Sequence, residues 1–150
     1  MTHARPAPAT PVVNPAPAAR PDDPARLLRL VVRVDGVSTA VMAAVLIVAA
    51  VPLGELTGMP TGFTLGFGGY QMAGAVALLL IARLPVIRPV IARVVIAVNL
   101  LSGVGCVVMA FVDPISLTGF GVVFLLVGAL VVTVYAALEY AGLRRLTAAV

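Results

Sequence analysis

From about residue 30 onward, the chain consists of long apolar blocks separated by short breaks. Glycine, proline and charged residues gather in the breaks at 54–62, 84–89 and 113–114, and the blocks between them are almost entirely apolar. A hydrocarbon core about 30 Å thick requires roughly 20 helical residues, and four blocks meet that length. The pattern predicts an all-α protein, a four-helix transmembrane bundle. Its helices are expected at about residues 31–53, 64–84, 91–112 and 118–141.

The first 29 residues differ from the rest of the chain. Seven of the twelve prolines lie there, interleaved with alanine and accompanied by few large apolar side chains. Because proline fixes φ and has no backbone N–H, this composition predicts an extended, disordered tail over residues 1–29. The bundle is then expected to occupy residues 30–146, and residues 147–150 form a short C-terminal tail.

The overall composition supports a membrane location and excludes several classes of function. Hydrophobic residues make up 61% of the chain and charged residues 11%, whereas soluble domains contain about 45–50% and about 25%. Cys106 is the one cysteine, so no disulfide can form within the chain. His3 is the one histidine and lysine is absent, which removes the usual catalytic triads, zinc sites, haem ligand pairs and P-loops. We therefore expect no enzymatic activity, no cofactor and no metal site.

All ten basic residues are arginines, and they are unevenly distributed along the chain. They lie before the first predicted helix, around the second loop and after the fourth helix, while the other two loops contain none. The candidates for contacts with lipid headgroups or for ion pairs are Arg29, Arg33, Arg83, Arg88, Arg93, Arg144 and Arg145. The positive-inside rule then predicts a multi-pass protein of the cytoplasmic (plasma) membrane with both termini in the cytoplasm.

The same arginines predict the immediate surroundings of the protein. Beside an anionic leaflet, each arginine gains about 1 kcal/mol, so a lipid bilayer with anionic headgroups is the expected partner. Nucleic acid is not expected, because the arginines are spread over three segments without an aromatic platform on which bases could stack.

A weak internal repeat relates residues 31–84 to residues 95–146. At a constant offset, the first and third predicted helices carry matched sets of small, polar or polarisable residues. These sets are Asp35, Ser38, Thr39 and Met42, and Asn99, Ser102, Gly103 and Cys106. The spacing i, i+3, i+4, i+7 places each set on one stripe of a helix. The pattern favours a duplicated helical hairpin with both halves in the same orientation, and the alternative is the chance similarity of two apolar hairpins.

Four short motifs resemble those of a known group of proteins. They are Arg33-Val34-Asp35-Gly36, Leu56-Thr57-Gly58-Met59-Pro60, Val98-Asn99-Leu100-Leu101 and Ala141-Gly142-Leu143-Arg144-Arg145. Over about residues 30–146 the chain is similar to the small four-span integral membrane proteins common in high-GC actinobacteria. The resemblance implies the four-span topology. That group has no assigned activity, so the resemblance implies no catalytic residue.

Four polar side chains within the predicted spans are candidates for function: Asp35, Gln71, Asn99 and Glu139. A carboxylate at the bilayer centre costs roughly 2.5–3.5 kcal/mol on insertion scales, so intramembrane acids are functional candidates by default. The two acids are expected within one or two turns of the cytoplasmic helix ends, close to several arginines. Either they form ion pairs with these arginines, or they take part in handling an ion or substrate. Gln71 and Asn99 are expected to form interhelical hydrogen bonds.

The glycines fall into two predicted groups. Gly103, Gly119, Gly121 and Gly128 are expected at close helix contacts, because a missing side chain lets two backbones approach. The glycines at every fourth position from 54 to 66 are interpreted as part of a turn.

Two classes of function remain open from the sequence. The first is a non-catalytic structural or accessory protein that packs against itself or in a larger membrane complex. The second is a small transporter or channel. Because four spans enclose little volume, transport is expected to require a homo-oligomer. Acids paired with arginines would favour the first class, and acids that face a cavity would favour the second.

Overall fold

The structure is a computed structural model that describes residues 25–112 and 114–148, so most of the predicted N-terminal tail lies outside the described residues. Its helices are α1 (Arg26–Val48), α2 (Ala50–Thr57), α3 (Thr61–Arg83), α4 (Pro89–Val112) and α5 (Gly119–Ala148). The helices α1, α3, α4 and α5 are each long and apolar enough to cross a membrane. The predicted all-α four-helix bundle is confirmed.

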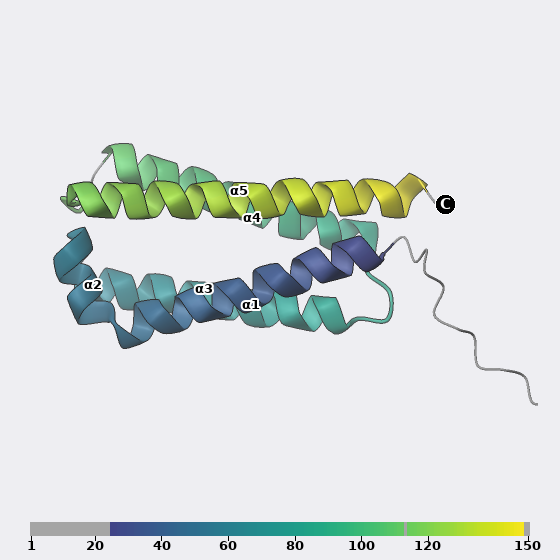
Figure 1. The fold of residues 1–150 in the computed structure, drawn as a ribbon, viewed down its shortest axis with the longest axis horizontal. Coiled ribbons are helices and arrows are strands. Elements are labelled where there is room, and N and C mark those ends of the chain that lie inside the picture. The colour runs from purple at the N-terminus through teal and green to yellow at the C-terminus, as the bar shows by residue number, and fades with distance from the viewer. Residues whose placement is uncertain (1–24, 113, 149–150) are drawn as a thin grey trace, which may run out of the picture.

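The four long helices form two layers (Figure 1). In one layer α1 packs against α3, to which it is joined through α2, and in the other α4 packs against α5. The layers meet along α1 and α5, whereas α3 and α4 are scarcely in contact. The bundle is therefore a pair of helical hairpins, which is the arrangement that the internal repeat predicts.

Two helices extend further than the hydropathy pattern predicted. α1 begins at Arg26 and so includes the last residues assigned to the tail, and α5 continues to Ala148, past the predicted end near 141. The arginines in these turns lower the local hydropathy, although arginine is a good helix former. As a result, Asp35 and Glu139 each lie nine residues from a helix end, about 14 Å at 1.5 Å per residue. The acids are deeper in the bundle than expected.

The first predicted span, residues 31–53, is broken at Ala49 into α1 and α2. Pro52 explains the break, because it has no N–H to donate to the carbonyl group of Val48 and its ring crowds that turn. α2 then ends at Gly58, whose φ of 78° lies in the left-handed region that glycine adopts without strain.

α2 closes one end of the bundle by binding the start of α5. The backbone N–H of Thr118 donates to the carbonyl oxygen of Thr57 at 2.9 Å. The side-chain hydroxyl of Thr118 donates to the carbonyl oxygen of Leu56 at 2.6 Å. The same hydroxyl oxygen accepts the N–H of Gly121 at 3.1 Å, which is an N-cap interaction. One threonine thus begins α5 and fixes it to α2.

The opposite end of the bundle holds a buried apolar cluster, which we call the apolar plug. It contains Leu28, Val32, Leu78, Ala82, Ile87, Ala92, Val95 and Leu143, from all four long helices and the α3–α4 loop. Arg29 borders it and donates to the carbonyl groups of Ala82 at 2.9 Å, Pro85 at 3.1 Å and Leu84. These are carbonyl groups at and just beyond the C-terminal end of α3, where intrahelical partners run out.

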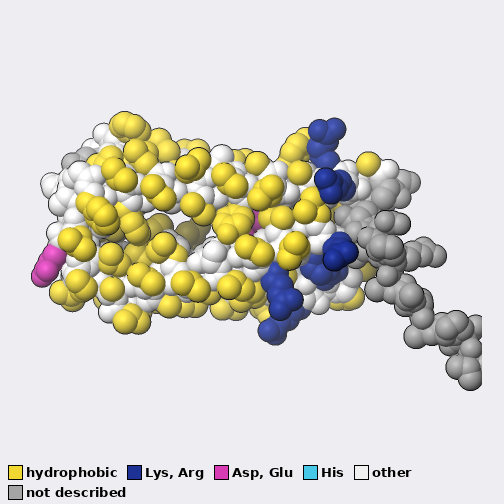
Figure 2. All heavy atoms as spheres, viewed as in Figure 1, with side chains coloured by type: hydrophobic (Ala, Val, Ile, Leu, Met, Phe, Trp, Pro, Cys, Tyr) yellow, Lys and Arg dark blue, Asp and Glu magenta, His cyan; other side chains and the backbone are white. Residues whose placement is uncertain are grey.

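On the face that Figure 2 shows, hydrophobic side chains cover the surface except at the two ends. Val48, Leu101 and Phe111 are among the most exposed of them, at 87%, 73% and 75%. The arginines gather at the end that contains the start of α1, the α3–α4 loop and the end of α5, and we call this the arginine end. Its exposed arginines are Arg26, Arg33, Arg83, Arg88, Arg93, Arg144 and Arg145. This distribution suits a bundle surrounded by lipid.

Two of the four glycines expected at close contacts have that role. A Cβ at Gly121 would overlap the carbonyl oxygen of Thr57, and one at Gly103 would lie 3.2 Å from a methyl carbon of Val132. The other two, Gly119 and Gly128, have open space at the Cβ position among the described residues.

The contact at Gly121 can be tested by adding one methyl group. We expect Gly121→Ala to destabilise the bundle by about 1–3 kcal/mol, because overpacking against a fixed backbone cannot be relieved by a rotamer change. Thermal unfolding in detergent measures the effect. Gly128→Ala is the matched control on the same helix and should be neutral or slightly stabilising, since alanine is the better helix former. Equal unfolding temperatures for the two variants would contradict the close contact between α2 and α5.

Candidate intramembrane binding site

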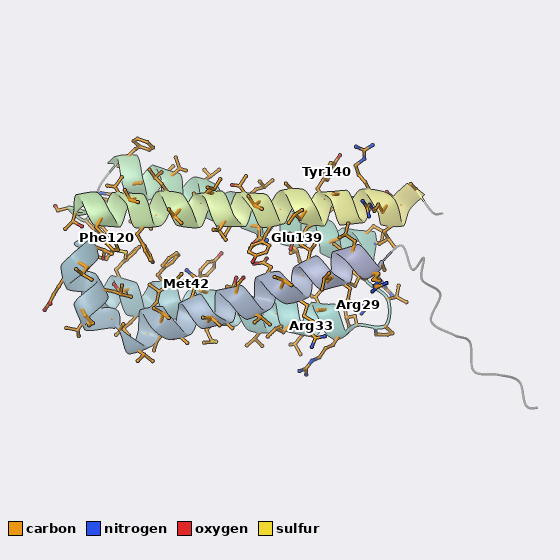
Figure 3. All side chains as sticks on the ribbon, in the orientation of Figure 1. Arg29, Arg33, Met42, Phe120, Glu139 and Tyr140 are labelled. Carbon is orange, nitrogen blue, oxygen red and sulfur yellow. The ribbon has the colours of Figure 1, made fainter. Side chains whose placement is uncertain are left out.

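Polar side chains from three helices meet near the middle of the bundle. Asp35 on α1 and Glu139 on α5 lie nine residues from a helix end, and Asn99 lies ten residues after Pro89, where α4 begins. All three helix ends belong to the arginine end, so the three side chains stand at the same depth. Figure 3 shows Glu139 in the space between α5 and α1. We call Asp35, Asn99 and Glu139 the carboxyl cluster.

The amide group of Asn99 joins the two acids. Its Nδ2 donates to Asp35 Oδ2 at 2.9 Å and to Glu139 Oε2 at 3.2 Å. Thr39, one turn along α1, donates its hydroxyl to Asp35 Oδ1 at 3.1 Å. Asp35 is 1% exposed and Glu139 is 0% exposed. Both amide hydrogens are therefore used to hold two buried carboxyl groups together.

Glycines allow the helices to approach closely around this cluster. A Cβ at Gly36 would lie 3.0 Å from the side chain of Leu79, and one at Gly142 would lie 2.9 Å from the Cα of Leu28. The first contact brings α1 against α3, and the second brings α5 against α1. Gly36 follows Asp35 directly in the chain, and Gly142 lies about one helical turn after Glu139. The close helix contacts at these glycines therefore place the two acids in the interior of the bundle.

The expected ion pairs between these acids and arginines are not formed among the described residues. Asp35 is held by Asn99 and Thr39, and Glu139 Oε1 is buried with no hydrogen-bond partner in this part of the chain. Arg29 is bound to backbone carbonyl groups instead, and the other candidate arginines are exposed. The reason is depth, because long arginine side chains near a helix end extend toward the interface rather than the centre.

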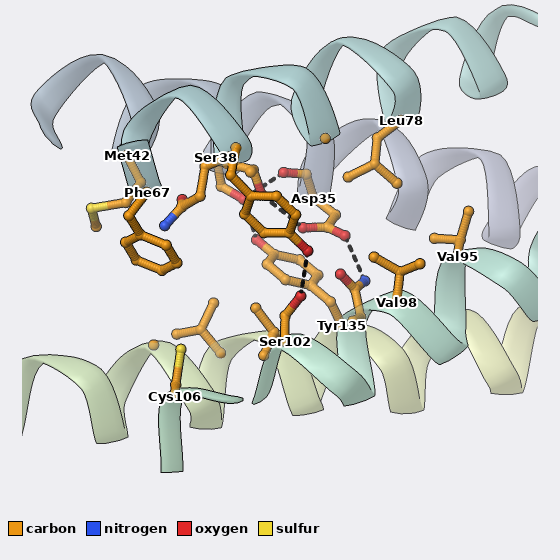
Figure 4. A pocket seen from close by; sticks show the side chains of 18 of the residues that line it. Asp35, Ser38, Met42, Phe67, Leu78, Val95, Val98, Ser102, Cys106 and Tyr135 are labelled. Carbon is orange, nitrogen blue, oxygen red and sulfur yellow. Dashed lines mark hydrogen bonds between the residues drawn. The ribbon is translucent and has the colours of Figure 1, made fainter. Parts of the chain in front are cut away.

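A cavity of about 380 Å³ lies beside the carboxyl cluster (Figure 4). Its wall is polar around Asp35 and Asn99, and Glu139 is not among the wall residues. The other polar wall residues are Ser38, Thr39, Tyr70, Gln71, Ser102 and Tyr135. The rest of the wall is apolar or aromatic and includes Phe67. A second cavity of about 390 Å³ shares several wall residues with the first and lies mainly between α3 and α4.

Two hydroxyl pairs cross the cavity from one hairpin to the other. Ser38 on α1 is hydrogen-bonded to Tyr135 on α5 at 2.9 Å, and Ser102 on α4 is hydrogen-bonded to Tyr70 on α3 at 3.0 Å. The two serines are matched positions in the predicted repeat. Seven of the eight matched positions line the cavity, and the exception, Gly103, contacts α5. The two predicted stripes therefore face each other across the cavity.

The apolar plug borders the cavity toward the arginine end, and several wall residues at its sides are exposed. Leu78 and Val95 of the apolar plug form its wall toward the arginine end, and α2 bound to α5 closes the opposite end of the bundle. Wall residues reach the outer surface on each side: Met42 is 40% exposed, Tyr70 54% and Val127 54%. Figure 2 shows a recess between the layers in the half of the bundle away from the arginines. The cavity is thus bordered laterally by exposed side chains.

Comparison of the chain with protein-family models, with curated proteins and with solved structures gives no match. The site is therefore interpreted from its own geometry, and the resemblance to small four-span actinobacterial proteins stays a prediction.

Sequence reasoning found part of this site. It selected Asp35, Asn99 and Glu139, which the structure brings together, and Gln71, which lines the cavity without a hydrogen bond to another described residue. It did not assign the two wall tyrosines to the site. A signal was present, because Tyr70 and Tyr135 are 65 positions apart, close to the offset of 64 between Asp35 and Asn99.

The amide group is expected to be essential for the carboxyl cluster. Asn99→Leu should destabilise the bundle by at least about 1 kcal/mol, because it removes the one donor to Glu139 and one of the two donors to Asp35 among the described residues. Thermal unfolding in detergent is the measurement. Gln71→Leu, at a half-buried site without a described hydrogen bond, is the control and should change stability by less than about 0.5 kcal/mol.

The double variant Asn99→Leu with Glu139→Leu should regain part of the lost stability, since it removes the acid that has lost its one described donor. An additive or larger loss in the double variant would show that the amide does not act through these carboxyl groups.

Proposed function

We propose that this protein binds a membrane-soluble small molecule between its two hairpins, as the substrate-binding step of a small transporter. One observation carries the proposal: a cavity that is bordered laterally by exposed side chains and has a polar group of side chains on one wall. Its volume falls within the range of about 300–1,000 Å³ that is usual for small-molecule sites. A molecule dissolved in the bilayer would reach it without crossing water.

The apolar plug supports a carrier in preference to a channel. Ion conduction needs a continuous polar or water-filled path, and at the arginine end the cavity meets buried leucine, valine, isoleucine and alanine side chains. A single chain already encloses a cavity of about 380 Å³. A homo-oligomer is therefore not needed to provide the volume for a small substrate. A carrier would move its substrate by shifting one hairpin against the other.

We further propose that the protein lies in the cytoplasmic membrane with the arginine end facing the cytoplasm. The exposed arginines at this end and the exposed Glu55 on α2 at the other support this orientation. Both chain termini would then be cytoplasmic. Anionic headgroups of the inner leaflet would contact the arginines, each contact worth about 1 kcal/mol.

Cysteine labelling in intact cells tests the orientation. In a Cys106→Ala background, a membrane-impermeant maleimide should label Glu55→Cys and should not label Val86→Cys in the α3–α4 loop until the cells are broken open. Both positions are exposed in the structure, so a difference in labelling reports the side of the membrane. Labelling of Val86→Cys in intact cells would contradict the proposed orientation.

The second candidate function is a structural or accessory role in a membrane assembly, as a homo-oligomer or in a larger complex. A stripe of small residues on α3 favours it: Gly62, Gly66, Gly69 and Ala73 are all exposed. The interpretation of the glycines from 54 to 66 as part of a turn is wrong for Gly62 and Gly66, which lie within α3. Among the described residues, no heavy atom beyond the chain neighbours and the helix's own backbone lies within 4 Å of the Cβ position of Gly62, Gly66 or Gly69. Stripes of this kind allow close approach of another transmembrane helix.

Three compounds of similar shape and different charge test the binding proposal: tetraphenylphosphonium, tetraphenylsilane and tetraphenylborate. At least one should bind the detergent-solubilised protein saturably, as measured by calorimetry or by the rise in unfolding temperature. Gly74→Leu should reduce that affinity at least about tenfold, since Gly74 lines the cavity with open space at its Cβ position. Gly69→Leu is the matched control on the outer face of α3 and should leave binding unchanged.

Absence of saturable binding by all three compounds would overturn the proposal and leave the accessory role as the better one. Equal binding by Gly74→Leu and the native protein would show that the compounds do not occupy the cavity.

A further inference from the structure

The cavity presents hydrogen-bond acceptors and negative charge to a ligand. Among the described residues that form the cavity wall, one is acidic, Asp35, and none is an arginine. Both hydrogens of the Asn99 amide are already donated to carboxylate oxygens, which leaves its carbonyl oxygen as an acceptor. The aromatic rings of Phe67, Tyr70 and Tyr135 also line the cavity, and aromatic faces attract cations. A ligand with a positive charge and an apolar body matches this wall.

A second observation points to an exchangeable proton behind that wall. Glu139 is fully buried, its Oε1 has no partner among the described residues, and its Oε2 shares one amide with Asp35. The shared amide nitrogen lies 2.9 Å from Asp35 Oδ2 and 3.2 Å from Glu139 Oε2, so the two carboxyl groups are close neighbours. Two negative charges so close together and without a cation are unfavourable in the interior of a bundle. A proton held by the pair removes one of these charges.

We propose, as an extension that rests on the proposed function, that the cavity takes a lipophilic monovalent cation in exchange for one proton held by Asp35 and Glu139. In the exchange, the O–H bond of one carboxyl group breaks and its electron pair stays on the oxygen. The proton passes to water, and nothing is oxidised or reduced. The net charge of the buried site is unchanged, whereas gain of the cation or loss of the proton alone would alter it by one unit at a depth where charge is costly.

The groups that face the pair from each helix support this assignment. α1 contributes Asp35 itself, α5 contributes Glu139 and Tyr135, α3 contributes Tyr70, and α4 contributes no acidic or basic side chain to the wall beyond the thiol of Cys106. The two tyrosine hydroxyls are hydrogen-bonded to serines. The carboxyl pair is therefore the acidic group at this site that a bound cation would face.

Proton release during binding tests the exchange directly. Tetraphenylphosphonium is added to the full-length protein in weakly buffered detergent solution with a pH indicator, and the amount bound is measured in parallel. We expect about one proton released per bound cation near pH 7, and an affinity that weakens about tenfold per unit fall in pH while the pair holds its proton, as reciprocal linkage requires. Tetraphenylborate should bind at least about tenfold more weakly than tetraphenylphosphonium.

Three substitutions locate the effect. Asp35→Asn should weaken tetraphenylphosphonium binding at least about tenfold, because it removes the carboxylate in the wall. The Glu139→Gln variant should release less than about half a proton for each cation that it binds, compared with about one proton for the native protein. Glu55→Gln is the matched control, since Glu55 is an exposed acid on α2 at the far end of the bundle, and it should behave as the native protein does.

The outcomes separate this inference from the proposed function. Saturable binding of tetraphenylphosphonium without proton release, or with an affinity independent of pH, would overturn the exchange and leave the binding proposal intact. Preference for tetraphenylborate would overturn the choice of a cation. Full proton release in Glu139→Gln would show that the pair is not the source. Failure of every tetraphenyl compound to bind would remove the proposed function and this inference with it.

Discussion

The structure depends on one amide group that holds two buried carboxyl groups at the same depth. Asn99 donates one hydrogen to Asp35 and one to Glu139, and in doing so ties α4 and α5 of one hairpin to α1 of the other. Within lipid, apolar surfaces gain little by packing against each other, so polar contacts and close backbone approach decide how helices associate. This contact joins the two hairpins at their centre.

The space around the cluster follows from where the helices can and cannot approach. Glycines bring α1 against α3 and α5 against α1, and the apolar plug fills the arginine end. Beyond the cluster no comparable contact draws α3 toward α4, where a hydrogen bond between Tyr70 and Ser102 spans the gap. The two hairpins contact each other at the apolar plug, at the Asn99 amide and between α2 and α5. The cavity is the space between these contacts.

The groups that fasten the hairpins also form the polar wall of the cavity. A ligand that bound Asp35 would therefore act on the contact that holds α1 to α4, and a change in the protonation of the pair would act on the same contact. In the proposed carrier, binding, proton content and the relative position of the hairpins would be coupled through these few atoms.

The sequence by itself determined the four apolar helices, the arginines that share one end and the matched stripes on α1 and α4, because hydropathy, helical period and charge distribution are local properties of the chain. It also selected both acids and Asn99, since polar groups are rare in such helices. Only the tertiary structure decided that the acids share an amide instead of pairing with arginines, and that a cavity adjoins them. These features depend on how deep each side chain lies and on which backbones approach at Gly36 and Gly142, and one-dimensional patterns do not encode the distances between helices.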